Sequence, residues 1–179
     1  MACSMLGILS AKQHGAERII AMSRHESRQK LARESGATDI VPERGEVGVA
    51  RIMDMTRGIG ADTTLECVGT QQSMKQAIDC TRPGGTVGYV GVPHGVELDG
   101  AELFFKHVRL FGGPAPVRRF LPDLIDQVLS GKSKPGKVFG LTLALDQSGR
   151  PYRGHACGSG QLPAVRPREG RVVGSAGAR

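Results

Sequence analysis

Hydrophobic positions along residues 1–147 follow two alternating spacings. Apolar residues three and four positions apart predict helices, and short continuous apolar runs predict strands. The expected helices cover residues 5–16, 26–35, 47–56, 71–80 and 120–129, and the expected strands cover residues 18–22, 38–41, 61–68, 86–92, 108–111 and 137–145. This alternation predicts an α/β fold, a doubly wound parallel sheet with helices on both faces.

Local signals support several of these boundaries. Gly36 follows the second helix, as glycine often does past a helix C-terminus. Thr70 stands where an N-cap is expected before the helix 71–80, and residues 82–85 (Arg-Pro-Gly-Gly) predict a turn into the next strand.

The periodic pattern stops after residue 147. Residues 148–179 are rich in Gly, Pro and Arg, and we expect them to be disordered because they bury too little apolar surface to offset chain entropy. They hold six Arg and one Glu, so most of the net charge of +7 belongs to this tail. The expected organisation is therefore a domain over residues 1–147 and a tail over 148–179.

Composition limits the cell compartments and the classes of partner that are expected for this protein. The four cysteines are scattered without a C-x-x-C pair, which predicts reduced thiols in a cytoplasmic protein. No apolar run approaches the roughly 18 residues of a membrane span, so we expect no membrane partner. Apart from Tyr152, the basic tail lacks aromatic residues that could stack on bases, which argues against a nucleic-acid partner.

Five short motifs occur in sequence at residues 15–24, 35–39, 60–62, 66–70 and 82–91. In this order and spacing, they together resemble the medium-chain dehydrogenase/reductase family, within it the zinc-dependent alcohol dehydrogenase branch. The resemblance implies a Rossmann domain for residues 1–147. The family's glycine loop would align with the start of the chain, with its second glycine at Met1 and its last at Ser4. We therefore expect the first strand and an intact glycine loop to be missing from this sequence.

The missing strand would be central in the sheet, between residues 18–22 and 61–68. Losing four or five buried aliphatic side chains would cost on the order of 10 kcal/mol. This predicts a marginally stable or aggregation-prone monomer.

Ser23 and Arg24 occupy the positions where an acidic residue would bind the ribose 2′-hydroxyl of NAD. A hydroxyl and a guanidinium suit the 2′-phosphate of NADP instead. NADP is therefore the expected cofactor, with NAD as the alternative. Ser23 and Glu26 also match a capping box that would begin the next helix, and the two interpretations are compatible.

The resemblance also implies cofactor contacts at the ends of two later strands. The first set is Cys67, Val68 and Gly69, which alternatively form only a turn before a helix. The second set is Val90, Gly91 and Val92, which alternatively form only a buried strand end. The three residues around His94 follow this second strand, but we expect the histidines to lie at the surface or in turns.

We expect neither catalytic nor metal-binding residues here, because the family's zinc ligands belong to an upstream domain. The implied function is part of an oxidoreductase that transfers a hydride between NADP(H) and an alcohol or carbonyl substrate, inactive without the zinc domain. A zinc-free quinone or enoyl reductase and a non-catalytic binding module are the alternatives. The sequence is compatible with a homo-oligomer and does not determine the oligomeric state.

Overall fold

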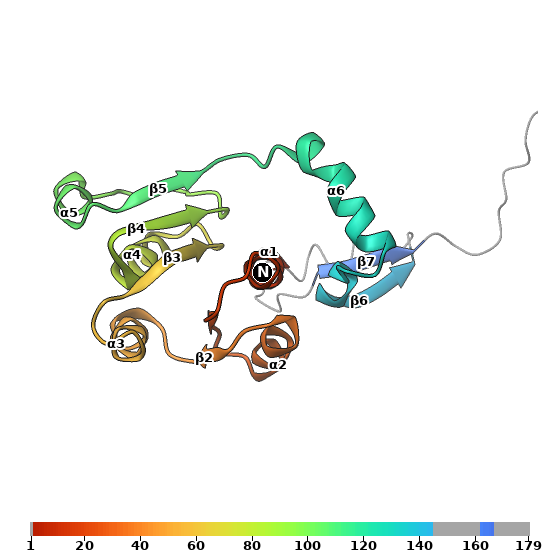
Figure 1. The fold of residues 1–179 in the computed structure, drawn as a ribbon, viewed down its shortest axis with the longest axis horizontal. Coiled ribbons are helices and arrows are strands. Elements are labelled where there is room, and N and C mark those ends of the chain that lie inside the picture. The colour runs from red at the N-terminus through yellow and green to blue at the C-terminus, as the bar shows by residue number, and fades with distance from the viewer. Residues whose placement is uncertain (1, 145–161, 167–179) are drawn as a thin grey trace, which may run out of the picture. The chain divides into compact units, whose positions relative to one another are not determined.

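The computed structural model describes residues 2–144 and 162–166, which fall into two compact units, residues 1–134 and 135–179. In the first unit, helices and strands alternate as expected (Figure 1). Its elements are α1 (Ala2–Gln13), β1 (Ile20–Met22), α2 (Glu26–Ser35), β2 (Asp39–Val41), α3 (Gly45–Met55), β3 (Ala61–Glu66), α4 (Gln71–Cys80), β4 (Thr81–Tyr89), α5 (Gly100–Lys106), β5 (Arg109–Gly112) and α6 (Val117–Leu129).

The strands of this unit form two parallel sheets, one of order β1-β2 and one of order β3-β4-β5. The prediction of a parallel α/β fold is confirmed. The sequence analysis expected β1 and β3 to flank the position of the missing central strand. In the structure, these two strands belong to different sheets. Each of them hydrogen-bonds to a single neighbouring strand of the described chain.

Strand β4 differs from its expected limits at both ends. It begins at Thr81, so the predicted Pro-Gly-Gly turn lies inside it, where the register with β3 shifts from Ala61↔Thr81 to Thr63↔Thr86. It ends at Tyr89 rather than Val92, and β3 ends at Glu66 rather than Val68. Both sets of expected cofactor residues therefore lie in the loops that follow these strands.

Helix α4 contributes to two hydrophobic clusters of this unit. Met74, Ala77 and Ile78 share one helical face and pack with Val87 of β4. Cys80, at the end of the same helix, packs with Val41 of β2 and with Ile52 of α3. Burial raises the pKa of the Cys80 thiol to about 11, as expected for a core position.

The helix ends confirm two predictions and correct one. Thr70 caps α4 in a reciprocal capping box with Ser73, and Gly36 ends α2 in the left-handed conformation, at φ 117°. The predicted capping box of Ser23 and Glu26 is wrong, because the N-cap of α2 is His25 and no side chain caps this end. Three residues separate Met22, the end of β1, from Glu26, the first residue of α2, so the N-cap position falls on His25 and not on Ser23.

The second unit contains a 3₁₀ turn at Pro135–Val138 and strand β6 at Phe139–Ala144. Strand β7 at Leu162–Arg166, which the sequence pattern did not predict, pairs with β6 in parallel. The rest of the predicted tail, residues 148–161 and 167–179, lies outside the described residues. Among the described helices, none has both the length and the apolar character required to cross a bilayer.

Candidate functional site

The loop after β3 is held in shape by the last residue of the strand, Glu66. Its side chain is 2% exposed, and its Oε1 accepts hydrogen bonds from the backbone N–H groups of Val68 at 2.6 Å and Gly69 at 2.9 Å. The Glu66 carbonyl oxygen accepts from Val90 at 2.8 Å and Gly91 at 3.3 Å. One residue thus ties together the loops that follow β3 and β4.

Two glycines allow these loops to touch through their backbones. A Cβ at Gly91 would lie 2.5 Å from the Gly69 nitrogen, and a Cβ at Gly69 would collide with the Val92 carbonyl oxygen. Gly69 also has a φ of 85°, which side chains rarely adopt. The structure therefore brings together the two predicted sets, Cys67–Gly69 and Val90–Val92.

The side chains of these loops differ in exposure. Val68, Val90 and Val92 are exposed, whereas Cys67 is half-buried. Burial raises the pKa of the Cys67 thiol, so this thiol stays protonated and is a poor nucleophile at neutral pH. The surface offered to a ligand is mainly apolar side chain and backbone, which suits positioning a cofactor rather than covalent chemistry.

The other two predicted cofactor-binding residues, Ser23 and Arg24, follow β1. Ser23 is 5% exposed and its N–H donates to the Val41 carbonyl of β2, while Arg24 is exposed. Because β1 and β2 run in parallel with Met22 opposite Val41, the residues after both strands emerge at one edge. This is the edge where ligands of open α/β sheets bind.

Two further arginines lie near this edge, and the sequence analysis missed them. Burial and the nearby charge of Arg44 lower the pKa of Arg28. Arg28 lies on α2, after β1, and Arg44 is the N-cap of α3, after β2. Two guanidinium groups that repel each other favour an anion between them. The sequence alone did not show this proximity, because Arg28 and Arg44 follow different strands.

Glu66 was also missed. The sequence analysis quoted it only as the first residue of the family motif at residues 66–70, three positions before Gly69. His94, which follows β4, donates its backbone N–H to the Gly69 carbonyl at 3.2 Å, and its side chain is exposed as expected.

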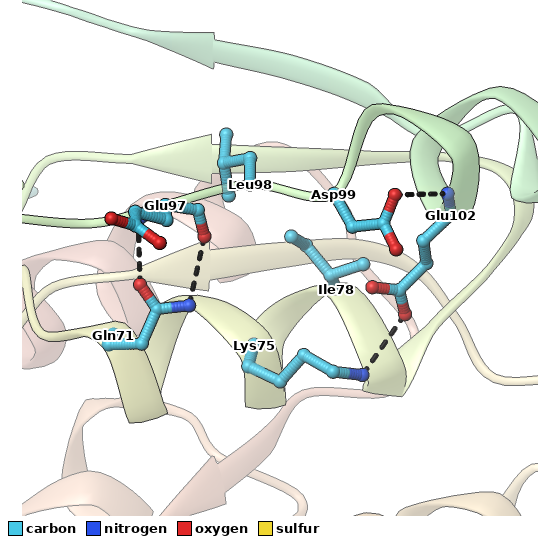
Figure 2. A pocket seen from close by; sticks show the side chains of 7 residues that line it. All are labelled: Gln71, Lys75, Ile78, Glu97, Leu98, Asp99 and Glu102. Atoms are coloured by element: carbon cyan, nitrogen blue, oxygen red, sulfur yellow. Dashed lines mark hydrogen bonds and ion pairs between the residues drawn. The ribbon is translucent and has the colours of Figure 1, made fainter.

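A pocket of about 410 Å³ lies elsewhere, between α4 and the segment leading into α5 (Figure 2). None of the eight predicted residues lines it. Four of its polar side chains are engaged in structural contacts: Gln71 exchanges two hydrogen bonds with the Glu97 backbone, Lys75 pairs with Glu102, and Asp99 caps α5. We therefore assign the candidate site to the strand ends and not to this pocket.

A zinc site does not fit the described residues. Within residues 2–144 and 162–166, no three His, Cys, Asp or Glu side chains converge on a point where they could hold a metal ion.

Parallel strands joined by helices, with candidate ligand loops at their carboxyl ends, define a Rossmann-like α/β domain. The sequence model of the family described as zinc-binding dehydrogenase matches residues 3–129. This chain belongs to that family.

Individual relatives support this family membership. A probable zinc-binding alcohol dehydrogenase of Mycobacterium tuberculosis is 34% identical over 163 residues, which cover 89% of this chain and 41% of that protein. The chain thus spans less than half the length of this curated relative. The solved alcohol dehydrogenase TADH from Thermus sp. ATN1 superposes with a TM-score of 0.81 at 26% identity, covering 92% of this chain and 49% of TADH.

Two further solved structures differ in their cofactor. One is an NAD-dependent alcohol dehydrogenase, with a TM-score of 0.75 at 27% identity over 84% of this chain and 43% of its own. The other is a zinc-binding dehydrogenase from Sinorhizobium meliloti bound to NADP, with a TM-score of 0.68 at 26% identity over 81% and 44%. Membership of the family therefore leaves the choice between NAD and NADP to the residues of this chain.

Proposed function

We propose that this chain is the cofactor-binding part of a cytoplasmic oxidoreductase that transfers a hydride between NADP(H) and a small alcohol or carbonyl compound. The observation that carries the cofactor choice is the exposed guanidinium of Arg24, two residues after the end of β1. The loops Cys67–Gly69 and Val90–Val92 would contact the same cofactor at the neighbouring sheet. We propose the cytoplasm because Cys3, Cys67 and Cys80 are free thiols.

Electrostatics at the β1–β2 edge supports NADP over NAD. The residue at the usual acidic position is Ser23, so no carboxylate stands there to repel a 2′-phosphate. Arg24 is exposed and can bind a phosphate through two parallel hydrogen bonds. Arg28 and Arg44 add positive charge at the same edge, and a phosphate dianion would relieve their mutual repulsion.

We further propose that the chain alone does not oxidise alcohols. In the parent enzyme, zinc would polarise the substrate oxygen as a Lewis acid. This chain's own contribution would be to bind and orient the dinucleotide. Zinc-dependent turnover of an alcohol by the purified chain would contradict this part of the proposal.

The cofactor choice is tested with two probes that differ by one phosphate, adenosine 2′,5′-bisphosphate and 5′-AMP, measured by titration calorimetry. We expect the bisphosphate to bind about 10- to 100-fold more tightly, the range for hydrogen bonds to a charged group. The R24A variant should lose this preference and keep its affinity for 5′-AMP.

The matched control is R33A, which removes an exposed arginine from the far end of α2, the helix that follows Arg24. It should leave both affinities unchanged. Equal affinity of the unaltered chain for the two probes would refute the NADP assignment.

A further inference from the structure

Glu66 carries a feature that structural stability does not account for. Its side chain is almost completely enclosed, and its Oε2 has no hydrogen-bond partner among the described residues. A buried polar atom without a partner costs free energy, and a buried charge costs more. A local cost of this kind in a folded protein is expected where function requires the residue.

The other carboxylate oxygen of Glu66, Oε1, is hydrogen-bonded, and its partners indicate the role of the residue. Oε1 holds the N–H groups of Val68 and Gly69, the two residues before the N-cap Thr70 of α4. The positive end of a helix dipole favours a carboxylate near its first turn. The Glu66 side chain is therefore placed to fix the backbone of a turn whose Gly69 adopts a φ of 85°.

The main chain of Glu66 also holds the loop that follows β4. Its carbonyl oxygen binds the N–H groups of Val90 and Gly91, directly after β4. Gly91 in turn lies against the backbone of Val68 and Gly69. A shift of the Glu66 side chain would therefore displace the turn that both loops share.

We propose that Glu66 is the positioning residue of the cofactor site, which presets the loops Cys67–Gly69 and Val90–Val92 for the dinucleotide. This inference rests on the proposed function. The Glu66 carboxylate acts through the backbone of the two loops and is not itself a catalytic group. Removing its acceptor oxygens loosens the loops and weakens cofactor binding, while the β3–β4 ladder stays intact.

The test compares E66M, which fills the volume without a hydrogen-bond acceptor, with E66Q, which keeps a carbonyl oxygen at the side-chain end. Replacing a buried charge by an apolar side chain of similar volume is often neutral or stabilising, so E66M is expected to fold. D62N is the matched control, since Asp62 is an exposed carboxylate on the same strand.

Amide hydrogen exchange followed by NMR gives the first readout. In E66M, the Val68 and Gly69 amides should exchange about tenfold faster or more, which is the effect expected from losing a hydrogen bond to a charged group. The amides between β3 and β4 should keep their rates. E66Q should restore most of the protection, and D62N should match the unaltered chain.

The second readout is the dissociation constant of NADPH, measured by its fluorescence. We expect E66M to weaken binding by about tenfold, with E66Q intermediate and D62N unchanged. Unchanged exchange at Val68 and Gly69, faster exchange throughout the sheet, or unchanged NADPH affinity in E66M would each overturn the inference. If the unaltered chain binds neither NADPH nor NADH, the proposed function fails, and loop exchange alone decides whether Glu66 holds the turn.

Discussion

The loop after β3 is enclosed by backbone, whereas the segment after β1 ends in an exposed guanidinium. Gly69 and Gly91 meet main chain to main chain, and Glu66 fills the interior beneath them. Arg24, in contrast, is exposed to solvent in the segment before α2 begins. A rigid loop suits the part of a ligand that must be placed accurately, and a long flexible cation suits the recognition of a phosphate.

The sheets that carry these two regions also differ, the sheet below the loop after β3 being the larger one. Sheet β3-β4-β5 has a strand of nine residues at its centre, and α4 covers it with a buried face. Strands β1 and β2 have three residues each, and an ion pair of Arg18 with Asp39 lies at their start. The Arg18 guanidinium lowers the pKa of Asp39, but this pair is largely exposed and contributes little. The comparison can be tested by substitutions matched between the two regions.

The largest effect is expected for G69A. Its new Cβ would require a left-handed backbone, which costs about 1–2 kcal/mol, and would collide with the Val92 carbonyl, which adds about 1–3 kcal/mol. We expect a total loss of about 2–5 kcal/mol in the free energy of unfolding, measured by urea denaturation.

The control for this prediction is G58A. Gly58 has a similar φ of 78° but open space around the Cβ position. It should show the backbone cost alone, about 1–2 kcal/mol. If both variants lose the same stability, the close approach of the two loops does not exist in solution.

A second, intermediate effect tests whether the sheets unfold together. Val87 of β4 and Val41 of β2 are both completely buried, and V87A and V41A each remove two methyl groups. We expect each to cost about 1.5–3 kcal/mol. Because α4 packs against both clusters, either variant should lower a single unfolding transition, followed by circular dichroism and by hydrogen exchange.

Independent sheets would give a different result. V41A would then open only the amides of β1 and β2 and leave those of β3–β5 protected. Such a result would sharpen the contrast between the regions and show that the phosphate-binding edge folds separately from the rigid loops.

The smallest effect concerns the helix caps. The T70A variant removes the capping box of α4 and should cost about 1 kcal/mol. H25S adds a capping hydroxyl to α2, whose N-terminus has no side-chain cap, and should stabilise the chain by about 0.5–1 kcal/mol. Thermal unfolding of both variants measures the difference. Destabilisation by H25S would mean that His25 has a role beyond starting the helix.

Much of the fold could be predicted because its signals are local. The limits of α2 and α4, the Thr70 cap and the Gly36 stop all follow from residues within a few positions of each other. The strand ends were placed less accurately. The apolar runs at Val68 and Val90–Val92 continue past the last ladder hydrogen bonds, and hydrophobicity does not show where pairing stops.

By itself, the sequence determined the alternation of helices and strands, the family resemblance, and the candidate residues at three strand ends. Only the tertiary structure decided which of these ends meet. It joined the loops after β3 and β4 through Glu66, left Ser23 free of helix capping, and brought Arg28 and Arg44 near one another. The physical reason is that periodicity and capping act over a few residues, whereas the register between strands and the contact of two glycines depend on residues far apart in the chain.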